Sequence, residues 1–595
     1  MKLIVLTFSL LCINLAVSQD MLIEAEGFED KGGWVVDPQF VEQMGSPYLL
    51  AHGMGVPVEN AKTRVIFNKD GEYKVWVRTK NWVPGNWEPP GKFQLKINNK
   101  VLQSILGQRS GWGWELAGTV SIRKKKNSVE LVDLTGFNGR IDAIYFTTSD
   151  AEPPSSMKKL ATWRKTVTQE PLAPNITKKF DLVVVGGGIA GCAASIAAAE
   201  QGLNVALIHD RPVLGGNASS EIRVHTLGIY GHFERILKKL DTEHYPNGSP
   251  EAYKDQEKRD NNVKSYKNIS LFLNWRAYDA KAIENRINYV DARQTASGER
   301  IRFEAPLFID STGDGWIGYW AGAEFTYGRE SVDKYGEHWE EHGELWSPKQ
   351  PDNAVMGSSV LWRSYEAEGN ENFPEVPWAM PVARDYAKVK GEWQWEFSRN
   401  DLNQIDDAEE IRDHMLRAIY GSFANAKKQA ENANRKLEWV SYLVGKRESR
   451  RLVGDYIFTL NDAKSGEKFH DAVVMETREV DVHYQTVLED EKNPDFISEA
   501  LFYKTPKYYI PYRSLYSKNI SNLFMAGRNF STSHVGLGGP RVMRTTGQMG
   551  AAVGFAASLC KKYEVDPRDI YTGYLDEYLT LIENQKYTPI PDSKQ

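Results

Sequence analysis

Apolar and polar positions alternate in short runs through residues 20–150. Alternation places one face of each run in a core and the other in solvent, which is typical of half-buried β-strands. Glycine, asparagine and proline separate the runs and favour turns between them. The pattern therefore predicts a β-sandwich, built from the runs KTRVIFN, GEYKVWVRTK, KFQLKINNKVL, TVSIRKK, SVELVDL and DAIYFTTS.

A different pattern begins at Phe180, after a stretch (151–178) whose AEPPSS and PLAPN segments indicate a linker. The residues FDLVVVGGGIAGCAASIAAAEQGLNVALIHD predict a buried strand, a glycine turn, an alanine-rich helix and a second strand. Gly186, Gly188 and Gly191 form the G-x-G-x-x-G pattern of this unit. These glycines provide a tight turn, room for a pyrophosphate and close helix packing, so a dinucleotide site at the helix N-terminus is predicted.

The end of the second strand departs from the usual dinucleotide site. An acidic residue that accepts ribose hydrogen bonds is expected there, but the sequence has His209, followed by Asp210. A neutral imidazole nitrogen can accept a hydrogen bond, so we expect a rearranged ribose contact from His209 and Asp210. Arg211 follows and is expected to neutralise phosphate or to cover the adenine.

Composition and charge narrow the function classes. The 595 residues carry a formal charge of −6 with acidic and basic residues interspersed, which argues against nucleic acid as a partner. Residues 1–18 have the layout of a cleavable secretory signal, which predicts a secreted or periplasmic protein, bacterial in origin. No other run reaches the length of a membrane span. Cys192 and Cys560 then remain, too few for an iron–sulfur cluster.

Four stretches resemble the FAD-dependent oxidoreductase family, some of whose members are labelled xanthan lyases. They are DRPVLGGNASSE at 210–221, FIDSTGDGWIGYWAG at 308–322, YIPYRSL at 509–515 and NLFMAGRNFSTSHVGLGGPRVMRTTGQMGAAVG at 522–554. The resemblance implies FAD as cofactor. Besides the residues above, it implies FAD contacts from Gly215, Gly216, Asn217, Ser219, Gly313, Asp314, Gly527, Arg528, Arg541, Gly547 and Gln548.

The implied fold is multidomain. An N-terminal β-sandwich (20–150) and the linker (151–178) precede an α/β Rossmann-type FAD-binding domain with an inserted α+β substrate domain. The FAD-binding domain is expected to span 179–330 and to close with 505–580, and the inserted cap domain covers 331–504.

The ends of the N-terminal region, IEAEGFEDKGGW and FNGRIDAIYF, resemble carbohydrate-binding modules of the galactose-binding-like sandwich type. That resemblance implies a structural calcium ion at Glu24, Glu26 and Asp142, although these can equally be ordinary surface acids. Four tryptophans in loop segments are candidates for stacking on a sugar, or are part of a purely structural domain: Trp82, Trp87, Trp112 and Trp114.

A flavin that oxidises an alcohol needs a base for the hydroxyl proton, and a near-neutral imidazole suits that role. His534, in the glycine-rich loop before the last long helix, is the first candidate, and His483 is the second. Tyr512 and Arg513 are candidates for orienting a substrate oxygen or the flavin carbonyl. In the insertion, three arginines either bind an acidic sugar or pair with nearby acids: Arg447, Arg450 and Arg451.

Three interpretations follow. The favoured one is an exported flavoenzyme that oxidises a sugar hydroxyl and passes electrons to an acceptor that the sequence does not identify. In the second, the oxidation is transient and assists elimination or glycoside cleavage. The third is a non-catalytic glycan-binding protein that keeps a flavin fold. Redox balance separates the first two, because only net oxidation consumes an acceptor.

Overall fold

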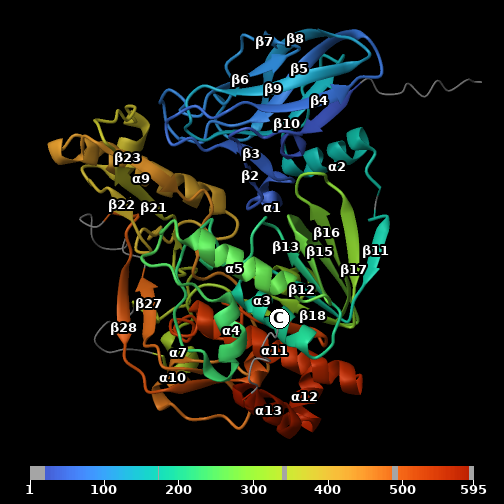
Figure 1. The fold of residues 1–595 in the computed structure, drawn as a ribbon, viewed down its shortest axis with the longest axis vertical. Coiled ribbons are helices and arrows are strands. Elements are labelled where there is room, and N and C mark those ends of the chain that lie inside the picture. The colour runs from blue at the N-terminus through green and yellow to red at the C-terminus, as the bar shows by residue number, and fades with distance from the viewer. Residues whose placement is uncertain (1–19, 172, 338–344, 485–493, 588–595) are drawn as a thin grey trace, which may run out of the picture.

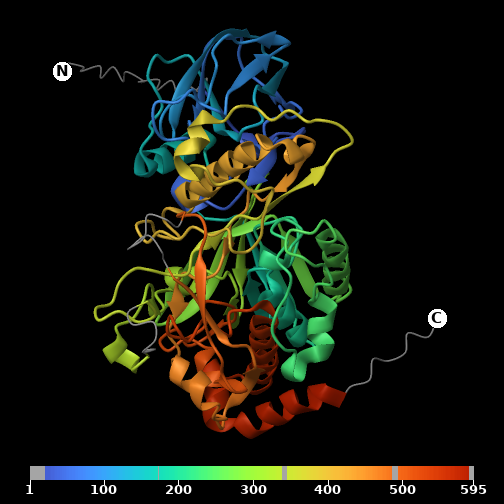
Figure 2. The same ribbon diagram turned by 90° about the vertical axis from the view of Figure 1, so that its left-hand side faces the viewer.

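The computed structural model describes residues 20–171, 173–337, 345–484 and 494–587. The predicted secretory signal lies outside these residues. Within the described ranges, no helix combines the length and the apolar character that a membrane span needs. Figures 1 and 2 show the N-terminal domain at one end of the long axis and helices α11–α13 at the other.

The N-terminal domain consists of two antiparallel sheets that share one hydrophobic core. Val75, Val77 and Ile144 contribute to this core from one sheet, and Leu95 and Leu131 from the other. The first sheet has the order β2-β3-β10-β5-β8, with β1 also on β10: β1 (Met21–Glu24), β2 (Val35–Asp37), β3 (Tyr48–Ala51), β5 (Gly71–Thr79), β8 (Gly113–Ile122) and β10 (Gly139–Thr147). The second has the order β4-β9-β6-β7: β4 (Ala61–Ile66), β6 (Phe93–Ile97), β7 (Lys100–Val101) and β9 (Lys126–Asp133).

The segment predicted to be a linker is ordered on both sides of residue 172. Helix α2 (Met157–Thr168) covers the outer face of β10, where its Leu160 packs with Trp114 and Tyr145. Strand β11 (Ile176–Lys179) then pairs in parallel with β17 (Arg300–Glu304) and extends the sheet of β17, β16 (Arg286–Gln294) and β15 (Trp275–Ile283). The linker prediction is therefore wrong, because α2 packs its apolar side chains on β10 and β11 pairs its backbone with β17, and the local sequence reveals neither partner.

A five-stranded parallel sheet forms the centre of the molecule, in the order β14-β13-β12-β18-β30. Its strands are β12 (Leu182–Val185), β13 (Val205–His209), β14 (Ile269–Leu273), β18 (Leu307–Asp310) and β30 (Leu523–Met525). Helix α3 (Ile189–Glu200) packs against α11 (Met543–Tyr563) at very short range. A side chain at Gly550 of α11 would lie 2.0 Å from the Ala190 carbonyl oxygen, so the small residues of both helices make this contact possible.

The inserted region contacts both other parts of the chain. Strand β26 (Ala472–Glu476) pairs with β29 (Tyr508–Pro511) and so crosses the predicted boundary at residue 505. Helix α9 (Ala408–Lys427) lies against the N-terminal domain (Figure 2). There Arg140 donates hydrogen bonds to Glu409 (2.8 Å) and Asp413 (2.9 Å) in a fully buried network. Buried charges with several partners each resist separation, so the N-terminal domain is fixed to the insertion.

Candidate functional site

A cavity of about 410 Å³ lies where the N-terminal domain, the central sheet and the insertion meet. Three turns reach it from the carboxyl ends of parallel strands: Gly186–Gly188 after β12, Gly313 after β18, and Gly527 after β30. In open α/β sheets, ligands bind at this edge of the strands. Most of the predicted cofactor residues line it, namely Gly186, Gly188, His209, Asp210, Arg211, Gly215, Gly216, Asn217, Gly313, Asp314, Gly527, Arg528 and Arg541.

The glycine turn has the geometry that its spacing predicts. Gly186 has a φ of 106°, and a side chain there would meet the Ser311 carbonyl oxygen at 2.1 Å. A Cβ atom at Gly191 would lie 1.8 Å from the Gly186 carbonyl oxygen, because the helix and strand close together at this point. Gly188 differs, since the nearest atom to such a Cβ is 3.9 Å away. Its backbone faces the open side, as an approaching phosphate requires.

His209 does not make the predicted ribose contact. Its Nδ1 accepts a hydrogen bond from the Gly187 N–H (3.1 Å), and its Nε2 lies 3.0 Å from the Val213 carbonyl oxygen. Burial, and then the Arg211 charge, lower its pKa to about 4, so the ring is neutral and serves both bonds. The imidazole therefore connects the glycine turn to the loop that follows β13.

The N-terminal domain supplies part of the cavity wall through Gln39, Phe40, Glu42 and Gln43. The Arg276 guanidinium group forms ion pairs with Glu42 (2.5 Å) and with Asp210 (2.9 Å), the residue after β13. Arg276 therefore connects the N-terminal part of the cavity wall to the end of β13. No sequence pattern predicted this contribution from outside the Rossmann unit.

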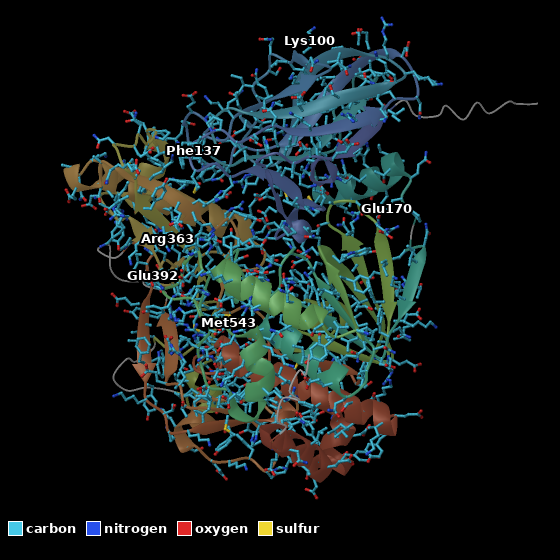
Figure 3. The ribbon with its side chains drawn as sticks, in the orientation of Figure 1. Lys100, Phe137, Glu170, Arg363, Glu392 and Met543 are labelled. Atoms are coloured by element: carbon cyan, nitrogen blue, oxygen red, sulfur yellow. The ribbon has the colours of Figure 1, made fainter. Side chains whose placement is uncertain are left out.

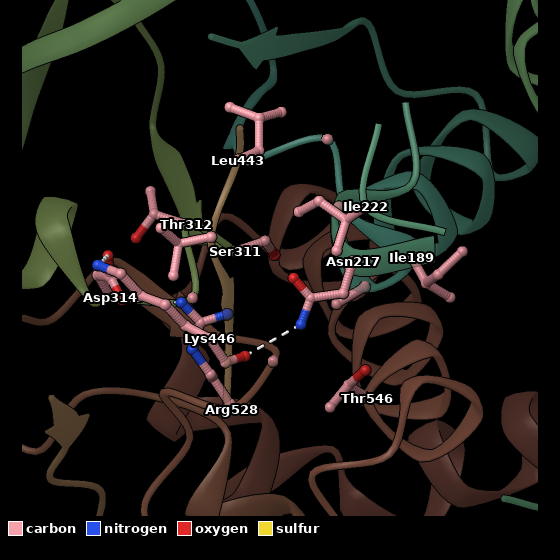
Figure 4. A pocket seen from close by; sticks show the side chains of 18 of the residues that line it. Ile189, Asn217, Ile222, Ser311, Thr312, Asp314, Leu443, Lys446, Arg528 and Thr546 are labelled. Atoms are coloured by element: carbon pink, nitrogen blue, oxygen red, sulfur yellow. Dashed lines mark hydrogen bonds and ion pairs between the residues drawn. The ribbon is translucent and has the colours of Figure 1, made fainter. Parts of the chain in front are cut away.

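Opposite charges meet at the turn after β18. Asp314 bonds both Lys446 and Arg528 at 2.8 Å (Figure 4). Burial by itself raises the pKa of Asp314, but these two cations outweigh burial and hold the pKa well below its usual range. Asn217 donates a hydrogen bond to the Lys446 carbonyl oxygen at 3.0 Å. Lys446 and Arg528 carry two positive charges against the single negative charge of Asp314. This side of the cavity therefore has an excess positive charge that suits a phosphate.

Four residues predicted to contact FAD have structural roles away from the cavity lining. Gly191 closes the helix on the turn, and Gly547 lets Leu237 pack on α11. The Gln548 amide donates to the carbonyl oxygens of Ile229 and Met475, both at 2.8 Å. The Ser219 hydroxyl oxygen lies 3.5 Å from Nη1 of Arg211. The resemblance placed them in the correct segments but on the packed side of the chain.

None of the four predicted catalytic residues lines the cavity. His534 is buried, with Nδ1 2.9 Å from Glu448, and His483 is bonded to Glu396 at 2.6 Å. Tyr512 donates to the Pro567 carbonyl oxygen (2.7 Å), and Arg513 pairs with Asp471 (2.9 Å). These partners hold all four side chains outside the cavity lining.

Instead, the cavity brings together an imidazole, three guanidinium groups and a carboxylate: His225, Arg447, Arg478, Arg541 and Asp481. His225 ends the same VALIHDRPVLGGNASSEIRVH segment that follows the glycine turn, which was the available signal for it. Of the three arginines considered for an acidic sugar, Arg447 lines the cavity and also pairs with Glu396, whereas Arg450 stacks on Tyr319 and Arg451 pairs with Glu330 outside the lining.

Arginine side chains contact the acids predicted to bind calcium. Glu24, Glu26 and Asp142 do come close together, but Arg164 of α2 forms ion pairs with Glu24 and Asp142. Arg78 also bonds Asp142, at 2.7 Å. Among the described residues no cluster of His, Cys, Asp or Glu suits a metal ion. A guanidinium group has the place that a cation would need.

The proposed sugar-stacking tryptophans are mostly interior. Trp82 and Trp114 are 3% and 2% exposed, and Trp112 donates its indole N–H to Glu409 of the insertion. Trp87 remains 39% exposed. These rings stabilise the domain and its interface, so they do not form a sugar platform together.

A parallel sheet with an open glycine turn defines a dinucleotide-binding protein. The chain belongs to the FAD-dependent oxidoreductase family, whose model matches residues 181–579, and the predicted family is confirmed. It is 38% identical to urocanate reductase of Eggerthella lenta over 116 residues, 19% of each chain. It is 27% identical to mitochondrial glycerol-3-phosphate dehydrogenase of Mus musculus over 155 residues, 26% of this chain and 18% of that one. The matches thus span about a fifth of these curated relatives.

Two solved structures also resemble parts of the chain. A geranylgeranyl bacteriochlorophyll reductase-like protein of Thermoplasma acidophilum is 13% identical, with a TM-score of 0.31, over 69% of this chain and 84% of that one. A family 35 carbohydrate-binding module of Clostridium thermocellum is 14% identical, with a TM-score of 0.18, over 22% and 98%. At these TM-scores, neither likeness supports an argument about function.

Proposed function

We propose that the protein binds FAD in the cavity and oxidises a hydroxyl group of a carbohydrate outside the cytoplasm. The observation that carries the proposal is the meeting of Gly188, Gly313 and Gly527 at one sheet edge, beside the cations Lys446 and Arg528. When bound, FAD supplies a hydride acceptor. The predicted secretory signal supports the extracytoplasmic location.

The described residues fit this cofactor. The turn at Gly188 leaves space for a pyrophosphate, and Lys446 and Arg528 supply its counter-charge. Asp210 provides the carboxylate for the ribose hydroxyl groups. Arg211 also lines the cavity and is paired with Glu221 at 3.2 Å. Together these groups would hold the charged and hydroxylated half of the molecule.

His225 is the cavity residue best suited to accept the hydroxyl proton of the substrate. Burial lowers its pKa below the ordinary value of 6.5, so the ring is neutral at pH 7. The ring lines the cavity, and a hydrogen bond with the Asn247 side chain raises its pKa without outweighing the effect of burial. An imidazole in this state accepts a proton readily.

The same wall supports a carbohydrate substrate. Trp393 and Asn247 line it beside His225, and an aromatic surface with a few polar groups suits a polyhydroxylated ring. This support comes from the cavity itself, since the tryptophans of the N-terminal domain are largely buried.

The test is the visible spectrum of the purified protein, followed without oxygen while mono- and oligosaccharides are added. A yellow protein that is bleached by one class of sugar supports the proposal and identifies the substrate class. A steady yellow spectrum with products appearing would instead support transient oxidation with net cleavage. A colourless protein that does not take up added FAD contradicts the proposal.

A further inference from the structure

Three arginines from separate segments line one wall of the cavity. Arg447 comes from the insertion, Arg478 from the loop between β26 and β27 (Val480–Tyr484), and Arg541 from the loop before α11. The pKa of Arg541 is lowered by burial and also by the Arg478 charge, and Arg447 in turn feels the Arg541 charge. The three guanidinium groups are therefore close enough to repel one another.

Their acidic partners are fewer. Asp481 pairs with Arg478 (3.0 Å) and Arg541 (3.1 Å), and Glu396 pairs with Arg447 (3.0 Å). Both carboxylates also contact His483. The next carboxylate behind them, Glu448, is bonded to Arg451 and His534. Among the described residues, three guanidinium groups thus share two carboxylates within ion-pair distance, one fewer than the number of guanidinium groups.

Cations also outnumber carboxylates near the glycine turn, where a bound cofactor would explain the excess. Lys446 and Arg528 share the single carboxylate of Asp314, and the pyrophosphate of FAD would compensate that charge. Arg447, Arg478 and Arg541 form their ion pairs with Glu396 and Asp481 and none with Asp314, so they are a second charged group in the cavity lining. An uncompensated charge in a buried site is costly, so the arginine wall needs an anion of its own.

The hydrogen-bonding state of the wall agrees with this need. The Nε atoms of Arg447, Arg478 and Arg541 are all buried and donate no hydrogen bond among the described residues. Planar guanidinium groups in a cavity lining match the paired oxygens of a carboxylate or sulfate. A second hollow shares Leu227 and Arg478 with the cavity, so Arg478 also faces a route from the surface.

We propose that the substrate carries an oxyanion, in the form of the carboxylate of an acidic sugar, and that Arg447, Arg478 and Arg541 bind it. The inference rests on the proposed function and narrows its substrate to uronic acids. The guanidinium groups would fix the carboxylate and thereby orient a hydroxyl group of the same sugar toward His225.

The test measures binding of glucuronate, galacturonate and mannuronate, each against its neutral sugar, with sulfate as a bare anion and glucose 6-sulfate as a sulfated sugar. The readouts are the change in the flavin absorption spectrum and the shift in melting temperature of the holoprotein, neither of which requires turnover. At least one uronate is expected to bind about tenfold or more tightly than its neutral counterpart. Stronger binding of glucose 6-sulfate than of every uronate would overturn the carboxylate assignment.

The matched variants are Arg478→Gln and Arg302→Gln. Arg302 pairs with Asp291 at 2.8 Å and is 22% exposed, whereas Arg478 pairs with Asp481 at 3.0 Å and is 25% exposed, so both lose a similar ion pair. Only Arg478→Gln should weaken uronate binding, about tenfold or more, while Arg478→Lys recovers part of it. Equal binding of uronates and neutral sugars, or equal effects of the two variants, overturns the inference.

These outcomes are separate from a failure of the proposed function. Bleaching by neutral sugars without any preference for uronates leaves the oxidoreductase proposal intact and removes only the acidic substrate. Conversely, a protein that binds no FAD contradicts the proposed function, and its melting temperature still reports whether uronates bind to the arginine wall.

Discussion

The two charged walls of the cavity arise in different ways. At the cofactor wall, the turn is the backbone of one βαβ unit, with Gly186, Gly188 and Gly191 inside six residues, while the cations Lys446 and Arg528 come from distant segments. At the arginine wall, side chains from three loops converge, and Arg447 and Arg541 are far apart in the sequence. A site made by local backbone geometry can be predicted from spacing, whereas a site made by convergent side chains needs the tertiary structure.

The substitution with the largest expected effect on FAD affinity is Gly188→Val. The residue has an extended backbone (φ −69°, ψ −179°) and space around its Cβ position, so valine should fold normally. Its methyl groups would fill the space that a pyrophosphate needs, and FAD affinity should fall by about 100-fold or more. Flavin fluorescence titration measures this. Gly369→Val, at another uncrowded glycine, should retain full affinity, and a yellow Gly188→Val protein would refute the assignment.

The next prediction concerns His225 as the base that accepts the hydroxyl proton of the substrate. His225→Asn should lower the rate of flavin reduction by sugar about 10²- to 10⁴-fold while FAD stays bound, because the variant cannot take the hydroxyl proton. Stopped-flow absorbance under anaerobic conditions measures this rate. His534→Asn is the control: it removes the buried contact with Glu448, so it should lower the melting temperature and leave the rate of the folded protein nearly unchanged. The opposite pattern would restore His534 as the base.

The pH profile sharpens the same assignment. The pKa of His225 in the folded protein lies below 6.5, and the neutral form is the active one. The rate constant kcat/KM should therefore be constant near neutrality and decline only when the pH falls below 6.5. A decline that begins above pH 7 would mean that another group acts as the base.

His209 predicts a smaller effect, on stability. Its folded pKa of about 4 is depressed from an unfolded value of 6.5, so only the unfolded chain gains a proton as the pH falls between them. The cofactor-free protein should lose about 3 kcal/mol of unfolding free energy from this group between pH 6.5 and 4. Urea denaturation at several pH values measures the loss. His209→Asn should show a shallower pH dependence, and an unchanged slope would contradict the buried neutral imidazole.

The smallest effect tests the contribution of the N-terminal domain. Glu42→Gln replaces the ion pair with Arg276 by a neutral hydrogen bond, which should loosen Asp210 and weaken FAD binding only a few-fold, or about 1 kcal/mol. Isothermal titration calorimetry on the apoprotein measures the change. Glu59→Gln, an exposed residue of the same domain, should have no effect. Equal affinities in all three proteins would show that the domain wall does not support the cofactor.

Much of the fold could be predicted from the sequence. The alternating run GEYKVWVRTK corresponds to β5, and SVELVDL to β9, because a period of two fixes which side chains enter the core. The prediction of a linker at 151–178 failed, since α2 and β11 are stabilised by partners far along the chain. The choice of His534 and His483 as candidate bases met a related difficulty. Imidazole chemistry made His534 a candidate, but burial against Glu448 removed it from the cavity.

The sequence by itself determined the glycine turn with its two flanking strands, several strands of the N-terminal domain and the family, because each depends on short-range spacing or on a contiguous motif. Only the tertiary structure decided that Glu42 of the N-terminal domain lines the cavity, that Arg164 pairs with Glu24 and Asp142, and that His225 and the three arginines line the same cavity. The physical reason is that a charge acts through distance in space. Its partners, and the free energy of leaving it without one, are set only when distant segments pack together.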